Sequence, residues 1–265
     1  MIIALAFALL FALQTPAQQA APPPPTAAGL RATIRLNIAR VDVPSNAPAS
    51  PLGNVGPLIA QLLTPDGPVE IEYLIAGDST RGEVRGRLAA FSRGTVVLQH
   101  LQDNAIKVLN PDNRTWYELP VTASLGAQIG APDVQMEPTG ETTTIAGQRA
   151  ERFRFVETLR FPAPEGANLP SDFPTTIDLS GDIWSTNAFA GSGYAAVFQT
   201  LQAAAAIPGM EALTAGGRFP LRIAVRSTMM SGYEIRSEVL SIGAADPPAS
   251  TFEVPKEYVQ VKGPR

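Results

Sequence analysis

Residues 69–90 read VEIEYLIAGDSTRGEVRGRLAA, and the alternation within them decides the fold. Apolar and charged residues alternate on both sides of Gly77-Asp78, a pair typical of tight hairpin turns. Because successive side chains of a strand point to opposite faces, Val84 and Leu88 share one face of the second strand, and its arginines and glutamate share the other. This stretch therefore predicts a β-hairpin with one apolar and one charged face.

The same alternation continues along most of the chain. Further strands are predicted at residues 30–38, 95–101, 105–109, 115–121, 142–145, 149–161, 176–185, 221–226 and 233–239, with a short helical turn at 58–63. Several strands carry Arg and Glu opposite their apolar face, which indicates a solvated sheet face with ion pairs worth about 0–1 kcal/mol each. The chain is therefore predicted to be mainly β and antiparallel.

One segment departs from this alternation. Residues 191–207 place four apolar side chains at i, i+3, i+4 and i+7, the spacing of an amphipathic helix. The opposite helix face carries Gln and Thr and no charge, so the segment lacks the basic face of a helix that lies on anionic lipid. We expect this helix to cover one side of the sheet as a lid.

The composition excludes several chemistries. The chain has no cysteine and one histidine, His100, which excludes disulfides, thiolate metal sites and His-rich metal sites. A Ser-His-Asp triad would have one possible base, and no G-x-S-x-G sequence accompanies it, so we interpret His100 as a strand-end residue. A net charge of -4 argues against broad nucleic-acid binding. We predict no catalytic residue, no metal and no cofactor, and a protein that is not an enzyme.

Two further patterns have a functional and a structural interpretation. Residues 191–196, GSGYAA, match the dinucleotide fingerprint G-x-G-x-x-A with Glu211 at the acidic position, but that fingerprint needs a parallel βαβ unit. Since the flanking strands read as antiparallel, we interpret the glycines as the entry to the lid helix. Glu70 and Glu72 share a strand face and could form a carboxylate pair for acid–base chemistry, although two glutamates on a solvated edge are the commoner case.

The first residues have the pattern of a secretory signal peptide. Residues 1–13, MIIALAFALLFAL, are an apolar run too short for a permanent membrane span, and Thr15-Pro16-Ala17 provides the small residues of a cleavage site. We expect a signal peptide over 1–17, a flexible Pro/Ala-rich arm over 18–29 and a single β domain over 30–265. The protein would then be secreted to the periplasm of a Gram-negative bacterium, with no permanent membrane span after cleavage. A retained membrane anchor is the alternative.

Three stretches carry a resemblance to a known group of proteins. They are AIKVLNPDNRTWYEL at 105–119, TIAGQRAERF at 144–153, and the ending that runs from GRFPLR at 217–222 to FEVPKEY at 252–258. They resemble secreted bacterial domains of unknown function with a LolA-like fold, the half-barrel with a helical lid of periplasmic outer-membrane lipoprotein carriers. The resemblance covers most of the mature chain and implies a cavity between the sheet and the lid. The resemblance assigns no functional residue to this chain, because each stretch is a hairpin pattern of the fold and none is a catalytic motif.

We therefore predict a non-catalytic protein that binds an apolar ligand, a lipid or an acylated partner between the sheet and the lid. The predicted ligand-binding residues are Leu36, Ile38, Phe153, Phe155, Ile177, Leu179, Leu221, Ile223 and Val225 on the sheet, and Tyr194, Val197, Phe198 and Leu201 on the helix. The same residues could instead fill a closed core. The alternative function is then an envelope protein–protein interaction module, without a ligand, that meets its partner through the proline-rich segments 44–57 and 162–174.

Overall fold

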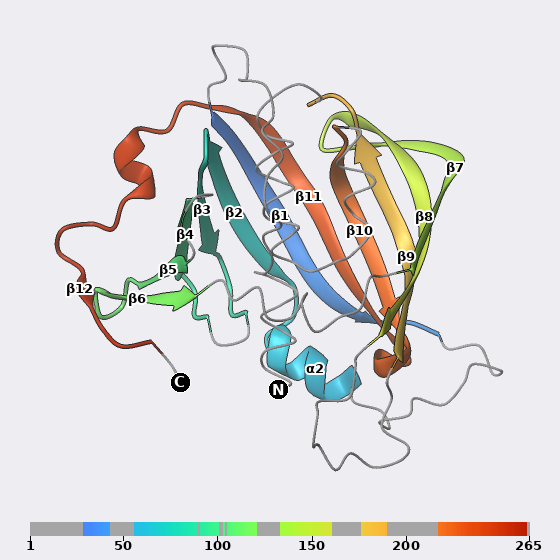
Figure 1. Cartoon of the computed structure of the whole chain (residues 1–265), viewed down its shortest axis with the longest axis horizontal. Coiled ribbons are helices and arrows are strands. Elements are labelled where there is room, and N and C mark those ends of the chain that lie inside the picture. The colour runs from blue at the N-terminus through green and yellow to red at the C-terminus, as the bar shows by residue number, and fades with distance from the viewer. Residues whose placement is uncertain are drawn as a thin grey trace.

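The strands of this protein form one large sheet (Figure 1). The computed structural model describes residues 29–42, 56–88, 91–100, 103, 105–120, 133–160, 176–189 and 217–263. The strands are β1 (Gly29–Arg40), β2 (Val69–Ala76), β3 (Ser79–Val84), β4 (Val96–His100), β5 (Ala105–Asn110), β6 (Thr115–Pro120), β7 (Asp133–Ile145), β8 (Gln148–Arg160), β9 (Thr176–Thr186), β10 (Phe219–Ser227), β11 (Tyr233–Ala245) and β12 (Val259–Gln260). Within these ranges the helices are α2 (Gly56–Leu63) and the 3-10 turns η1 (Thr228–Met230) and η2 (Ala249–Phe252). The prediction of a mainly β protein is confirmed.

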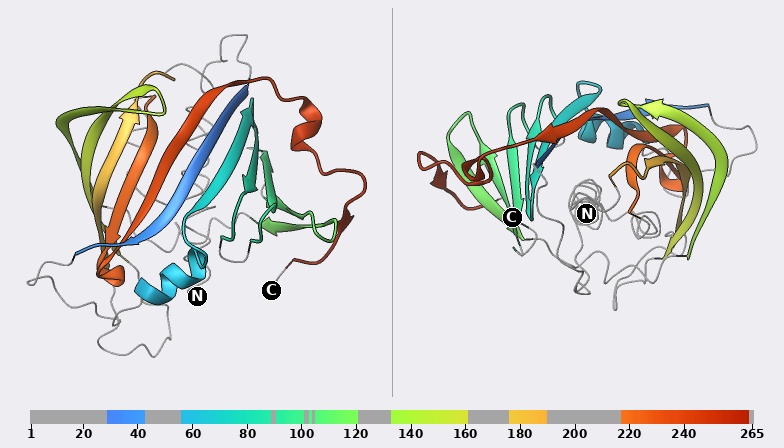
Figure 2. Two further views of the ribbon diagram at one scale, coloured as in Figure 1. Left: turned by 180° about the vertical axis from the view of Figure 1, so that it is seen from behind. Right: turned by 90° about the horizontal axis from the view of Figure 1, so that it is seen from above.

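The sheet is open and curled. The twelve strands in the described part of the chain follow the order β12-β6-β5-β4-β3-β2-β1-β11-β10-β9-β8-β7, so β1 lies in the middle and pairs with both β2 and β11. Neighbouring strands are antiparallel, except that β12 runs parallel to β6. Seen from above in Figure 2, the strands trace a half-barrel that bends from β7 on one side to β5 and β6 on the other. We call β2–β6 and β7–β10 the two arms of the sheet.

Glycines and bulges accommodate the curvature at defined points. The register shifts between Thr33 and Ile34 on β1, and again between Pro220 and Arg222 on β10. Each arm also has a strand glycine beneath an aromatic ring: a Cβ at Gly82 would lie 3.1 Å from Cε1 of Tyr73, and one at Gly181 would meet Cε1 of Phe155 and the carbonyl of Ala224. A side chain at either glycine would displace the ring that covers it, so both arms need glycine there.

Most predicted elements are present, with differences at their ends. The predicted turn at Gly77-Asp78 is confirmed, and the predicted helical turn at 58–63 is part of α2. β7 begins at Asp133 instead of at the predicted residue 142, because a register shift between Pro138 and Thr142 hides the alternation of its first half. Several predicted segments lie outside the described residues: the signal peptide, the arm up to residue 28, residues 44–55 of the first proline-rich segment, the second at 162–174, and the lid at 191–207. Among the described helices, none has the length and apolar character needed to cross a membrane.

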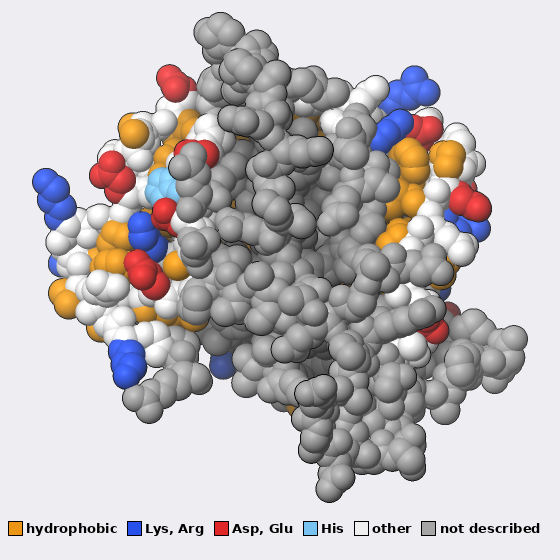
Figure 3. Space-filling view, viewed as in Figure 1, with side chains coloured by type: hydrophobic (Ala, Val, Ile, Leu, Met, Phe, Trp, Pro, Cys, Tyr) orange, Lys and Arg blue, Asp and Glu red, His pale blue; other side chains and the backbone are white. Residues whose placement is uncertain are grey.

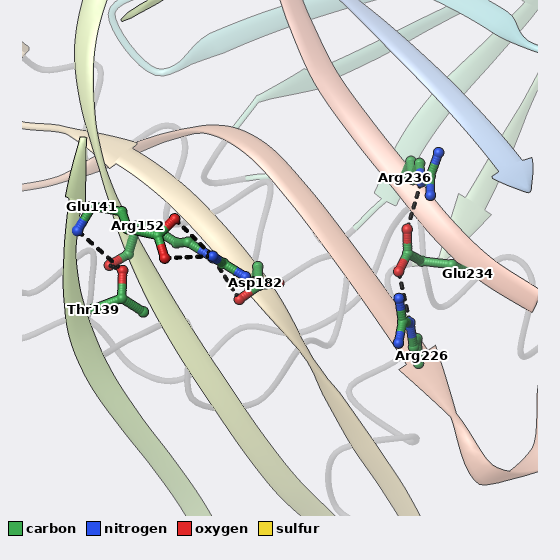
Figure 4. Close-up of polar contacts among 7 residues, drawn as sticks. All are labelled: Thr139, Glu141, Arg152, Asp182, Arg226, Glu234 and Arg236. Atoms are coloured by element: carbon green, nitrogen blue, oxygen red, sulfur yellow. Dashed lines mark hydrogen bonds and ion pairs between the residues drawn. The ribbon is translucent and has the colours of Figure 1, made fainter. Parts of the chain in front are cut away.

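The two faces of the sheet differ in chemistry. The register places Leu36 of β1 beside Val69 of β2, and Ile71 beside Val84, so apolar side chains continue from strand to strand on one face. This is the concave face, which is turned to the viewer in Figures 1 and 3. Arginines and glutamates alternate with these residues and lie on the convex face (Figure 4). At one end of the sheet, α2 packs Leu63 against Met230 and Tyr233.

Candidate functional site

The predicted ligand-binding residues of the sheet share the concave face but differ in exposure. Four of the nine are buried: Phe155, Ile177, Leu221 and Val225. The other five are partly buried: Leu36, Ile38, Phe153, Leu179 and Ile223. The four predicted lid residues, Tyr194, Val197, Phe198 and Leu201, lie outside the described part of the chain. Whether any of these residues binds a ligand stays a prediction.

One cluster unites five of these residues. Phe153, Phe155, Leu179, Ile223 and Val225 pack together with Ile183 and Met136, and we call this set the β8–β10 cluster. Three of the remaining four belong to neighbouring clusters: Leu36 packs with β2 and β3, Ile38 packs near α2, and Leu221 packs with β1 and β11. Ile177 is buried on β9 and belongs to none of these clusters. The predicted site is therefore a shared face divided among several apolar clusters.

The predicted ligand-binding residues do not include two members of this cluster, Ile183 and Met136. Ile183 faces Phe153 across the β8–β9 pair and is fully buried, and its place on the apolar parity of its strand was the available signal. Met136 faces Phe155 from β7, but its half of that strand was not predicted.

Polar groups lie at one end of the same face. Glu151, Phe153 and Phe155 alternate along β8, and the register places Glu151 directly opposite Ser185 of β9. Arg218, just before β10, donates from Nη2 to Oε2 of Glu151 at 2.6 Å, and its guanidinium lies 4.8 Å from the centroid of the Phe153 ring. We call Arg218, Glu151 and Ser185 the polar corner. None of the three was singled out from the sequence as a functional residue, because they are far apart along the chain.

The convex face carries a lattice of ion pairs. Arg35 contacts Glu70 at 2.8 Å, and Arg85 contacts Glu72 at 2.7 Å and Glu83 at 2.6 Å. The hydrogen bond from Arg85 lowers the pKa of Glu72 below its ordinary value, so Glu72 stays an ionised partner at neutral pH. Glu70 and Glu72 are therefore ion-paired structural residues. The expected edge position was wrong, since β2 is an inner strand between β1 and β3.

Figure 4 shows two further groups of this lattice, over β7–β9 and over β10–β11. Arg152 bridges Glu141 and Asp182 at 2.8 and 2.9 Å, and its guanidinium lies 5.8 Å from the Trp184 ring. Glu234 lies between Arg226 and Arg236. Every acid in these groups has an arginine partner, which fits the predicted solvated and ion-paired face.

The geometry around the histidine differs from that of a catalytic triad. His100 Nδ1 is 2.8 Å from Ser79 Oγ, and Asp78 Oδ1 lies 3.0 Å from the same hydroxyl. In a triad the carboxylate contacts the second nitrogen of the histidine, where it fixes the tautomer, whereas here it contacts the serine. His100 closes β4, as expected of a strand-end residue. Across the described residues, no group of three or more metal-ligating side chains comes together.

These observations define a class: an open, curled, predominantly antiparallel sheet with an apolar concave face and an ion-paired convex face. Residues 55–258, more than half of the chain, match a protein family described as "Domain of unknown function (DUF4412)". The protein belongs to this family, which confirms the predicted resemblance to a domain of unknown function. No curated protein matches the sequence.

Three solved structures are similar over most of their length. An uncharacterized conserved protein from Thermus thermophilus has a TM-score of 0.42 and 9% identity, over 89% of this chain and 91% of that chain. The lipoprotein LppX of Mycobacterium tuberculosis has a TM-score of 0.34 and 11% identity, over 85% and 89%. A LolA superfamily protein from Nitrosomonas europaea has a TM-score of 0.33 and 12% identity, over 95% and 96%. The last of these belongs to the superfamily that the sequence resemblance named.

Proposed function

We propose that this protein is a secreted periplasmic protein without catalytic activity that binds an apolar ligand, a lipid or an acylated partner on the concave face of its sheet. The observation that carries the proposal is the partial exposure of apolar side chains there. Phe153, Leu179 and Ile223 belong to one cluster and all keep part of their surface accessible. A ligand that covered them would gain about 25 cal/mol for each Å² of apolar surface removed from water.

The chemistry of the rest of the sheet supports binding over catalysis. The convex face is occupied by arginines and acids that are already paired with each other. The histidine contacts a serine whose neighbouring aspartate does not reach the imidazole. The predicted signal segment at residues 1–17 supports export, and the absence of cysteine is compatible with any redox compartment.

A pair of neighbouring residues on opposite faces provides the test. Leu179 lies on the concave face and faces Glu157, and Val156 lies on the convex face of β8 with 48% exposure. We expect Leu179→Gln to weaken binding of a neutral fluorescent apolar probe by about fivefold or more, because one buried contact between apolar groups contributes on the order of 1 kcal/mol. Val156→Gln is the matched control and should bind the probe like the wild type. Equal loss in both variants, or no probe binding to the wild-type protein, would refute the proposal.

One observation favours the alternative of a protein–protein interaction module. β12 pairs with β6 on one side, and it forms one edge of the described sheet. Val259 and Val261 are 65% and 41% exposed there, and an edge strand with exposed apolar residues can pair with a strand of a partner. Val259→Lys should abolish partner capture in that case and leave probe binding unchanged.

A further inference from the structure

The polar corner contains N–H donors of Arg218 that make no hydrogen bond to the described residues. A guanidinium carries five N–H groups, and the hydrogen bond to Glu151 is the one found for Arg218 among the described residues. The Phe153 ring beneath the guanidinium restricts its position. Arg218 is 27% exposed at the side chain, so it combines a fixed charge with remaining access.

Ser185 provides a second, independent observation. The residue is 1% exposed, and its Oγ is buried without a hydrogen-bond partner. A buried hydroxyl normally has a partner, because leaving it unsatisfied costs free energy. Ser185 is the residue directly opposite Glu151 across the β8–β9 pair, so it is the neighbour of the Arg218–Glu151 pair on the adjacent strand.

The apolar surroundings define what such a corner can bind. Phe153 contacts Arg218 on one side and belongs to the β8–β10 cluster on the other. A cation at the end of an apolar strip is complementary to a molecule with an anionic head and an apolar chain. Figure 3 shows hydrophobic side chains on this side of the sheet, over β8 and β9, with basic and acidic side chains beyond them.

We propose that the polar corner binds the anionic headgroup of an acyl amphiphile whose chain lies along the β8–β10 cluster. This inference rests on the proposed function and specifies its ligand class. Arg218 donates to the headgroup oxygens from N–H groups that Glu151 does not occupy, and Ser185 donates a further hydrogen bond. Glu151 holds Arg218 in place and, as a like charge, weakens the attraction for the incoming anion.

The test compares ligands that differ in the head or in the chain. Dodecanoate, dodecanol and acetate compete with a neutral apolar probe for the wild-type protein. We expect dodecanoate to bind about tenfold more tightly than dodecanol, as one charge-assisted hydrogen bond provides, and acetate not to compete. Arg218→Gln should remove the preference for dodecanoate and leave dodecanol within about twofold of its wild-type affinity.

Two further variants separate binding from folding. Arg222→Gln removes an arginine of the same strand that pairs with Glu238 at 2.7 Å on the convex face, and it should keep the preference for dodecanoate. Glu151→Gln should strengthen dodecanoate binding severalfold and leave dodecanol unchanged, because it removes a competing negative charge. A misfolded variant cannot produce that increase.

The outcomes are distinguishable. If dodecanoate and dodecanol bind the wild type equally, the headgroup assignment is wrong and the proposed function stands. If acetate competes as well as dodecanoate, the corner is a site for free anions and the inference is also overturned. If neither dodecyl compound binds, the proposed function fails and the inference fails with it.

Discussion

The two arms of the sheet use the same alternation for different purposes. In the β2–β6 arm the concave cluster has eight buried members, among them Val69, Ile71 and Val97, and four partly buried ones. The C-terminal segment covers part of the convex face of this arm with Val254 and Tyr258. In the β7–β10 arm the corresponding cluster has three buried and four partly buried members, and ion pairs occupy its convex side. An arm whose cluster is mostly buried and whose convex face is also covered is suited to stability, and an arm in which more than half of the cluster keeps accessible surface is suited to binding.

The largest expected effect is a loss of stability, and it should differ between one leucine of each arm. Leu98, in the β2–β6 arm, is 1% exposed beneath the C-terminal segment, whereas Leu179 in the other arm is partly buried. We expect Leu98→Ala to lower the free energy of unfolding by about 2–5 kcal/mol, the usual cost of a cavity in a core. Leu179→Ala should cost about 1 kcal/mol, because less surface is lost. Urea denaturation measures both, and equal costs would remove the contrast between the arms.

The pH dependence of stability provides a second test of the packed arm. Although the Tyr73 side chain is only partly buried overall, desolvation raises its pKa from 10.0 to about 12. Below pH 10 the tyrosine is protonated in both the folded and the unfolded state, so stability does not depend on it. Between pH 10 and 12 the unfolded state loses the proton first, and the free energy of unfolding should fall by up to roughly 3 kcal/mol.

Tyr73→Phe isolates this contribution. The phenylalanine variant keeps the ring over Gly82 and has no proton to lose, so its stability should fall less steeply above pH 10. Parallel slopes for the variant and the wild type would show that the Tyr73 hydroxyl is solvated, and would weaken the account of a tightly packed arm.

The smallest effect is expected on the convex face. Arg35 and Glu70 are 48% and 42% exposed, and solvent screens the attraction between them. We expect Arg35→Gln to change the free energy of unfolding by less than about 0.5 kcal/mol, with still less effect at high salt. A loss of more than about 2 kcal/mol would mean that the ion-pair lattice holds the sheet together, against the distribution of burial described above.

The sequence allowed the strands to be predicted where local signals were strong. Gly77 takes a positive φ of 57°, and the alternation on both sides of it was enough to predict β2, the turn and the start of β3. The first half of β7 was not predicted, because Pro138 and Gly140 break the alternation where the register shifts. β12 was not predicted either, since a strand of two residues is too short to show a periodic pattern.

The sequence could predict which face of the sheet carries the candidate site, but not which residues of that face form it. Alternation assigned Phe153, Phe155 and Leu179 to the apolar side, but it could not state which of them stay accessible, since that depends on strands that are distant in sequence. The polar corner depends on a contact between Glu151 and Arg218, which are 67 residues apart, and on the β8–β9 register that places Ser185 opposite Glu151. Neither relation has a local signal in the sequence.

The central claim is that the concave face binds an apolar ligand, and native mass spectrometry of the mature protein tests it most directly. The protein is purified gently from the periplasm of the host, and then again after incubation with bacterial membrane lipids. We expect a reproducible adduct with the mass of an acyl-chain compound, which Leu179→Gln reduces and Val156→Gln retains. A protein that stays at its unliganded mass in both preparations would contradict the account.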